Sequence, residues 1–205
     1  MKPAPAARPS IRQAHKDMTR ARIAEAARQC FYEKGVGDTS FEDIASAAGV
    51  RRATVYLHFA NKSAILAELL SRNLEEVRLI YERLRALGSH DVASVRKWLE
   101  SYVRALVRHR QAMRLFQIAM ATDDSVRVMI EDYRESVVRS LGESFAGFAP
   151  EKGRGHAAAV LMVVKVDFVA DAAAQLSPRL EVAAALDLVA EELSAMLLVG
   201  AAERP

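Results

Sequence analysis

The chain has 205 residues, of which 51% are hydrophobic, so it is long enough for one or two domains with a substantial core. Few glycines, prolines and aromatic residues, together with many charged ones, are typical of an all-helical protein. The single cysteine, Cys30, excludes an intramolecular disulfide and fits a reducing compartment. No uncharged apolar stretch approaches the roughly 20 residues of a membrane span.

Positive charge is concentrated near the N-terminus. Residues 1–62 carry 11 Lys and Arg against 6 Asp and Glu, whereas the remaining residues carry 18 and 20. The basic end is therefore where a polyanion would dock. Prolines interleave with basic residues in the segment 1–17, which predicts a flexible basic arm without the apolar segment of a signal peptide. We therefore expect a cytoplasmic protein with no membrane partner.

The first predicted helix covers about residues 19–34. Ile23 and Phe31 recur at helical spacing on its apolar face, where Cys30 also lies as a buried and unreactive thiol. Gly35 follows this pattern directly, and a glycine at that position is a normal helix end.

Two short helices are predicted next. Thr39 and Glu42 form the S/T-x-x-E pattern of a capping box, in which each residue satisfies an exposed backbone N–H of the other, so a helix should begin after Thr39. A third helix over about residues 52–58 is too short to be stable alone. Val55 and Phe59 are the expected inward anchors that hold it by packing.

A tight Ala-Gly-Val turn separates these two helices, and the second opens with paired arginines, an arrangement that suits a helix presented to the major groove of DNA. Arg51 and Arg52 stand where base or phosphate contacts form, and arginine can donate two parallel hydrogen bonds to guanine. Thr54, Tyr56 and His58 offer donors for phosphate oxygens. The alternative is that both arginines are only solvated, which would leave the basic bias of this end unexplained.

Asn61 is expected to cap a long fourth helix that continues to about residue 87 without a proline or glycine hinge. Lys62 lies in its first turn, where the helix dipole disfavours a cation by roughly 0.3–1 kcal/mol. A docked DNA phosphate would offset that cost. The alternative is an exposed lysine with little effect.

Residues 19–70 combine several motifs in one order without gaps. They are Ile23, Ala27, Phe31 and Gly35; Thr39 and Ser40; Ile44 and Ala45; Ala48, Gly49 and Val50; Thr54, Val55 and Tyr56; His58 and Phe59; Asn61 and Lys62. Together they resemble the N-terminal DNA-binding domain of the TetR family of bacterial transcriptional repressors.

The resemblance implies a homodimer that binds a palindromic operator in double-stranded DNA and carries a C-terminal effector domain. It also implies Arg52, Thr54, Tyr56, His58 and Lys62 as DNA contacts. The family usually has Ser or Thr at the position of Arg51. Because arginine is a poor N-cap, this departure leaves the start of the third helix less defined and Arg51 available to the operator.

We therefore predict an all-α fold of about nine helices in three parts. Residues 1–17 form the arm, 18–64 a helix-turn-helix domain, and 65–205 a helical domain for effector binding and dimerisation. The last two helices, over about 156–176 and 180–202, are so rich in Ala, Val, Leu and Met that both cannot face water. They form either an intrachain core or, as the resemblance favours, a four-helix bundle with a second copy.

A cavity for a small apolar or aromatic effector is expected among the C-terminal helices. The candidate lining residues are Trp98, Tyr102, Phe116, Met120, Tyr133 and Phe168. The alternative is that these Met and aromatic residues are ordinary core.

Three charged residues, Lys165, Asp167 and Asp171, interrupt an otherwise apolar helix, where an unpaired charge is costly. Asp167 and Asp171 share one face at i, i+4 spacing, and Lys165 points elsewhere. These residues could pair across a dimer, contact a polar group of a ligand, or reach solvent, as a lysine can do through its long stem.

No sequence motif indicates an enzyme. The chain has no nucleophile elbow, HExxH motif, P-loop or cysteine–histidine cluster, and its five histidines lack metal-ligand spacing. We therefore expect no cofactor and no metal. The predicted function is a dimeric, ligand-responsive transcriptional repressor. One alternative is a regulator controlled by a protein partner or by nothing, and another is a helical interaction module or enzyme of this fold that does not bind DNA.

Overall fold

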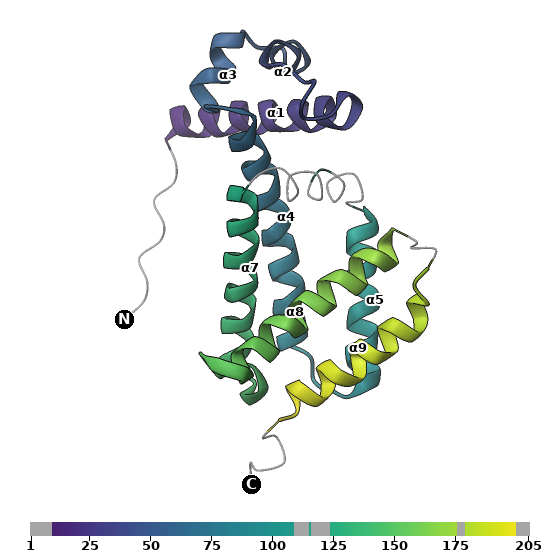
Figure 1. Ribbon diagram of the computed structural model, residues 1–205. Helices are drawn as coiled ribbons and strands as arrows, with labels where there is room; N and C mark the ends of the chain where they lie inside the picture. The colour runs from purple at the N-terminus through teal and green to yellow at the C-terminus, as the bar shows by residue number, and fades with distance from the viewer. Residues whose placement is uncertain (1–9, 109–114, 116–123, 176–178, 200–205) are drawn as a thin grey trace. The chain divides into compact units, whose positions relative to one another are not determined.

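The computed structural model describes residues 10–108, 115, 124–175 and 179–199, and within these ranges the regular structure is entirely helical (Figure 1). The predicted all-α fold is confirmed. The chain divides into two compact units, Met1–Ser71 and Arg72–Pro205. In the parts of the chain that the structure describes, no helix is both long and apolar enough to cross a membrane. The expected nine helices include one over about 111–121, and this segment lies outside the described residues except for Leu115, which is helical.

Helix α1 spans Ile11–Lys34, so the prediction of a flexible arm is wrong from residue 11 onward. The helix begins early because Ser10 caps it: the Ser10 hydroxyl accepts a hydrogen bond of 3.2 Å from the backbone N–H of Gln13. The Gln13 amide in turn donates to the Asp17 carboxylate at 2.8 Å. Cys30 is buried on the inner face of α1, as predicted.

Helix α2 spans Phe41–Ala48, and its capping box lies one residue later than predicted. The Ser40 hydroxyl accepts from the Asp43 backbone N–H at 3.1 Å, while the Asp43 carboxylate accepts from the Ser40 N–H at 2.8 Å. Thr39 is unavailable as the cap because its buried hydroxyl donates to the Gly35 carbonyl at 2.7 Å. A contact across the preceding turn therefore decided which residue caps α2.

Helix α3 spans Arg52–His58, and α4 spans Lys62–Arg85. The bounds of α3 are as predicted, and Val55 and Phe59 are buried and hold it from inside. Between α2 and α3, Gly49 adopts the left-handed conformation with φ of 62°, which a residue with a Cβ rarely adopts. Asn61 caps α4 as predicted, because its side-chain oxygen accepts from the backbone N–H of Ala64 at 2.8 Å.

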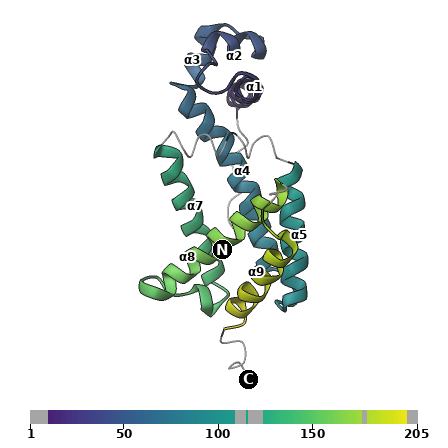
Figure 2. The ribbon, with the colours of Figure 1, turned by 45° about the vertical axis from the view of Figure 1, so that its right-hand side comes forward.

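Among its described residues, the C-terminal unit contains the second part of α4 and five further elements. They are α5 Val92–Arg108, α7 Asp124–Gly142, the 3-10 helix η1 Ala146–Phe148, α8 Gly153–Ala174 and α9 Val182–Leu197. Helix α8 packs against α5, α7 and α9, and α5 also packs against α9 (Figures 1 and 2). These contacts enclose one apolar core within the unit.

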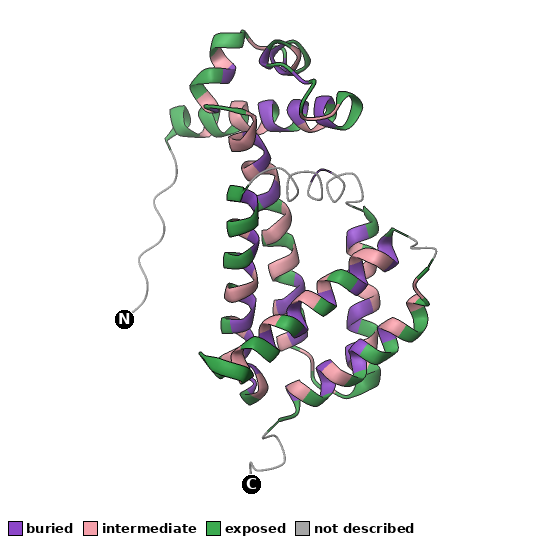
Figure 3. Ribbon diagram, in the orientation of Figure 1, coloured by how far each residue is buried: buried purple, intermediate pink, exposed green. Residues whose placement is uncertain are grey.

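Helices α8 and α9 are apolar on two sides, and only one side of each is buried within the chain (Figure 3). The buried side includes Val166 on α8 and Leu193 on α9. The other side leaves Leu161 and Phe168 of α8 63% and 64% exposed, and Leu188 of α9 56% exposed. The intrachain core therefore accounts for one face of these helices and leaves the other uncovered.

Candidate nucleic-acid interface and internal pocket

Helix α3 presents one exposed face with a basic start. Arg51 and Arg52 are exposed, and the Arg51 side chain makes no capping hydrogen bond, in line with its poor suitability as an N-cap. Arg52 donates to the Tyr56 hydroxyl at 3.2 Å, and its guanidinium carbon lies 5.6 Å from the centre of the Tyr56 ring. Tyr56 also packs on Phe41 of α2, with ring centres 4.7 Å apart. The Arg52 side chain is thereby oriented along the exposed face.

A shallow hollow adjoins this face and brings predicted site residues of α3 and α4 together. It is lined by Gly37, Asp38, Thr39, Ser40, Phe41, Arg52, Tyr56, Ala60, Asn61 and Lys62. Thr54, by contrast, lies half-buried on α3 and is not part of this lining.

Lys62, a predicted phosphate contact, is engaged within the protein in this DNA-free structure. Its ammonium donates to three backbone carbonyl oxygens, those of Val36 at 2.6 Å, Gly37 at 2.9 Å and Thr39 at 3.0 Å. An ammonium has three N–H bonds, so in this conformation none remains for a phosphate. These carbonyls offset the cost of a cation in the first turn of α4, and through them Lys62 braces the segment before α2.

A second brace involves Arg20, which the sequence analysis did not single out. Arg20 donates from two nitrogens to the Glu68 carboxylate, at 3.0 and 3.1 Å, and from a third to the backbone carbonyl of His58. Its guanidinium carbon also lies 4.1 Å from the centre of the Phe59 ring. These contacts fix the C-terminal end of α3. No local pattern could have revealed them, because the partners lie 38 and 48 residues away in the sequence.

His58 is a half-buried residue and its imidazole Nδ1 is buried without a hydrogen-bond partner among the described residues. Burial lowers its pKa, and the positive charges of Arg20 and Lys16 lower the pKa further. The ring is therefore held neutral near pH 7. The main contact that the structure shows for His58 is through its backbone carbonyl, which anchors Arg20.

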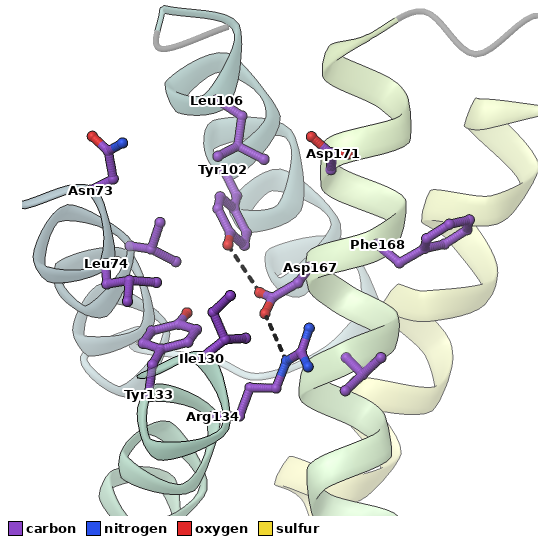
Figure 4. A pocket seen from close by; sticks show the side chains of 12 residues that line it. Asn73, Leu74, Tyr102, Leu106, Ile130, Tyr133, Arg134, Asp167, Phe168 and Asp171 are labelled. Atoms are coloured by element: carbon purple, nitrogen blue, oxygen red, sulfur yellow. Dashed lines mark hydrogen bonds and ion pairs between the residues drawn. The ribbon is translucent and has the colours of Figure 1, made fainter. Parts of the chain in front are cut away.

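The C-terminal unit contains a pocket of about 220 Å³ (Figure 4). It is lined by Asn73, Leu74, Val77, Tyr102, Leu106, Ile130, Tyr133, Arg134, Val164, Asp167, Phe168 and Asp171. The lining comes from α4, α5, α7 and α8, and it combines apolar side chains with a polar group around Asp167 and with Asn73 and Asp171.

Of the predicted lining residues, the structure brings Tyr102, Tyr133 and Phe168 to the pocket. The Phe168 side chain points away from the polar centre (Figure 4). Trp98 is instead part of the core, because its indole N–H donates to the buried backbone carbonyl of Ile80 at 2.9 Å. Phe116 and Met120 lie outside the described residues.

Asp167 is the centre of the polar group. One of its oxygens, Oδ1, accepts hydrogen bonds from the hydroxyls of Tyr81 and Tyr102, each at 3.0 Å. The other, Oδ2, lies 3.9 Å from Nε of Arg134, within ion-pair range and beyond hydrogen-bond range. Burial raises the pKa of Asp167 to about 6, although the two tyrosine hydrogen bonds and the Arg134 charge act in the opposite direction.

The other two charged residues of α8 have different environments. Asp171 lines the pocket on the same face as Asp167, and its carboxylate accepts from the Gln175 amide at 2.7 Å. Lys165 forms an ion pair with Glu192 of α9 on the surface. The structure thus places Asp167 and Asp171 at a cavity, whereas Lys165 lies between Leu161 and Phe168 on the exposed side of α8, paired with α9. The place of Arg134 in the pocket was not predicted, because an arginine on an amphipathic helix such as α7 ordinarily faces solvent.

Comparison with known proteins agrees with this architecture. The sequence profile of the family described as bacterial regulatory proteins, tetR family, matches residues 23–69, which include α2, α3 and the start of α4. The transcriptional regulator TtgR of Pseudomonas putida is 32% identical over 165 residues, an alignment that covers 73% of this chain and 77% of that protein. A probable acrEF/envCD operon repressor of Escherichia coli is 38% identical over 73 residues, covering 36% of this chain and 33% of that protein.

Solved structures share the fold. Salmonella enterica GusR has a TM-score of 0.66 at 23% identity, with 88% of this chain and 95% of that chain covered. The fatty acid degradation regulator FadR of Bacillus halodurans has a TM-score of 0.62 at 19% identity, with 96% and 98% covered. The proteins related in sequence are regulators of transcription and not enzymes. The chain belongs to the TetR family of bacterial transcriptional regulators.

Proposed function

We propose that this protein is a repressor that binds a palindromic operator as a homodimer, with α3 of each copy in the major groove of double-stranded DNA. The observation that carries the proposal is the exposed face of α3, on which Arg51, Arg52 and Tyr56 lie together. A helix offered to a groove must keep its position under the pull of the DNA. The braces formed by Arg20 and Lys62 supply that rigidity.

The proposed contacts differ in kind. Arg52 reads a guanine through its two parallel donors, and Arg51, Thr54 and Tyr56 contact phosphates. His58 contributes a neutral ring close to the backbone of the DNA. Lys62 acts by holding the segment that it braces, with its charge adding to the field that the DNA meets.

The experiment that tests DNA binding is selection of duplexes from a random pool by the full chain, followed by a mobility-shift titration. We expect a palindromic site whose half-site centres lie about one helical turn, roughly 34–36 Å, apart or a multiple of it. Failure to enrich any duplex would contradict the proposal and favour a helical interaction module. Because its ligand would be chromosomal DNA, the protein would work in the cytoplasm.

The uncovered face of α8 and α9 is the proposed dimer interface. Leu161 and Phe168 on α8 and Leu188 on α9 are too large and too exposed to be a stable solvent-facing surface when they lie together. Ala184 and Ala195 extend the same stripe of α9 as small exposed residues, which allow a second pair of helices to approach closely. A four-helix bundle of two copies would bury this face.

The pocket is the proposed effector site, and α4 is the proposed lever. This single helix carries Lys62, which braces the segment before α2, and also Asn73, Leu74 and Val77, which line the pocket. An effector that prefers a conformation with wrongly spaced recognition helices would release DNA, and DNA would weaken effector binding by the same factor. Compounds that bind the protein without changing its operator affinity would favour control by a protein partner, or no control.

A further inference from the structure

The pocket contains two polar atoms that face each other without being joined. Nε of Arg134 is buried and makes no hydrogen bond within the described residues, which is costly for an N–H donor. It faces Oδ2 of Asp167 across 3.9 Å, a distance too long for a hydrogen bond. The tyrosine hydroxyls do not remove this mismatch, since both reach Oδ1 of the same carboxylate. A hydrogen-bond donor, Nε of Arg134, and an acceptor, Oδ2 of Asp167, therefore face each other across a gap without forming a hydrogen bond.

One oxygen atom fits this gap. Two hydrogen bonds of about 2.8 Å that meet at a single oxygen can join atoms 3.9 Å apart. A hydroxyl group offers one donor and one acceptor, so it can donate to Oδ2 of Asp167 while it accepts from Nε of Arg134. Figure 4 shows both side chains pointing at each other from α7 and α8, so the oxygen would bridge two helices.

The gap suits a neutral group that both donates and accepts. An ammonium has no lone pair to accept from Nε of Arg134, and a carboxylate has no proton to donate to Oδ2 of Asp167, so neither can bridge the two atoms. An unbridged polar atom is costly here because the site is partly buried, with the Asp167 side chain only 20% exposed. Apart from Asn73 and the two tyrosines, the remaining walls are apolar and include Leu74, Val77 and Ile130.

We infer that the pocket binds an uncharged molecule that carries an alcoholic or phenolic hydroxyl on a compact apolar body, with the hydroxyl oxygen between Arg134 and Asp167. This inference rests on the proposed role of the pocket as the effector site and narrows the chemistry of the effector. The volume of about 220 Å³ limits the body to a small ring with a short substituent.

Four probes of similar shape test the inference by calorimetric titration of the full chain without DNA at pH 7.5. They are 4-propylphenol, 4-propyltoluene, 4-propylbenzoate and 4-propylbenzylamine, which place a hydroxyl, a methyl, an anion and a cation at one end of the same body. We expect 4-propylphenol to bind about tenfold more tightly than 4-propyltoluene, and both charged probes to bind more weakly than the phenol. Equal binding of phenol and toluene, tightest binding of a charged probe, or no binding of any probe would overturn the inference.

Two variants locate the hydroxyl. Arg134→Met and Asp167→Asn should each reduce the preference for 4-propylphenol over 4-propyltoluene towards one, while toluene binding persists and reports an intact pocket. The matched control is Asp132→Asn, an exposed carboxylate on the same helix as Arg134, which should leave the preference unchanged. A preference that survives in Arg134→Met, the variant with the more exposed side chain and the smaller risk to folding, would overturn the placement of the hydroxyl.

Operator release is measured separately, so the inference and the proposed function fail in different ways. Hydroxyl-selective binding without any change in operator affinity would support the inference and contradict the effector role. Operator release by ligands that show no hydroxyl preference would support the effector role and overturn the inference.

Discussion

The two units of this chain use their charged side chains in opposite ways. In the N-terminal unit, Lys62 and Arg20 donate hydrogen bonds to backbone carbonyls and to a carboxylate of the same unit. Arg51 and Arg52 remain exposed at the surface. In the C-terminal unit, Asp167 is drawn into a cavity and incompletely paired. A surface that meets a polyanion needs rigidity and exposed cations, whereas a ligand site needs polar groups that the protein itself leaves unsatisfied.

Two carboxylates make the same contrast at the level of single groups. Hydrogen bonds from Lys34 and Ser40 hold the pKa of Asp43 well below its usual range, so this carboxylate is fully partnered at the surface. Burial raises the pKa of Asp167 to about 6 in spite of its tyrosine partners. Asp43 stabilises the fold as an anion, whereas the protonation of Asp167 stays sensitive to a ligand in the pocket.

The largest effect should come from a charge placed on the uncovered face of α8 and α9. Leu161→Glu would bury a carboxylate without a partner in the proposed interface and weaken the dimer by about 3–5 kcal/mol. Light scattering at micromolar concentration should then report a monomer. The control is Val128→Glu, an equally simple change at an exposed valine of α7, which should leave the dimer intact. A dimer that survives Leu161→Glu would place the interface elsewhere.

The second-largest effect should come from removing the hydrogen bonds of Lys62. Lys62→Met leaves three carbonyl oxygens without their charged donor and should lower the free energy of unfolding by about 1–3 kcal/mol, measured by urea titration. Binding to all DNA sequences should weaken alike, with little change in the salt dependence. Lys34→Met is the matched control, because Lys34 forms only a surface pair with Asp43 and should cost about 0–1 kcal/mol. A salt slope shallower by about 0.9 in Lys62→Met would instead indicate a phosphate contact.

The third prediction concerns the base contact of Arg52. Arg52→Ala should cost about 1–3 kcal/mol per half-site and relax the preference at one base position, because two donors to guanine are lost. Selection of binding sites with the variant measures this directly. Arg51→Ala is the comparison and should weaken binding without altering the preferred sequence. An unchanged site for Arg52→Ala would show that this arginine contacts phosphate only.

The last prediction concerns the pH dependence that Asp167 gives to stability, an effect spread over about two pH units. Its pKa is about 6 in the folded chain and about 4 when unfolded, so between these values the folded state binds more protons. Stability from this group should therefore rise as the pH falls from 6 to 4, by at most about 1.4 kcal/mol per pH unit. Urea titrations of the parent chain and of Asp167→Asn should differ in slope in this window. Identical slopes would mean that Asp167 is better solvated than its place at the pocket implies.

Local sequence determined much of the N-terminal unit. The bounds of α3, its inward anchors Val55 and Phe59, and the Asn61 cap of α4 follow from spacing and cap chemistry within a few residues. These features are predictable because the groups that interact are neighbours along the chain. The resemblance to the TetR family added the prediction that α3 is the helix that contacts DNA.

Tertiary structure decided what depends on distant partners. Lys62 meets carbonyls 23 to 26 residues away, Arg20 meets Glu68 48 residues away, and Asp167 meets Tyr81 86 residues away. Even the cap of α2 is Ser40 rather than the predicted Thr39, because the hydroxyl of Thr39 donates to the Gly35 carbonyl. Sequence spacing shows which side chains share a helix face, but it does not show which backbone groups or charges another helix brings against that face, and those neighbours decided the roles of Lys62, Trp98 and Asp167.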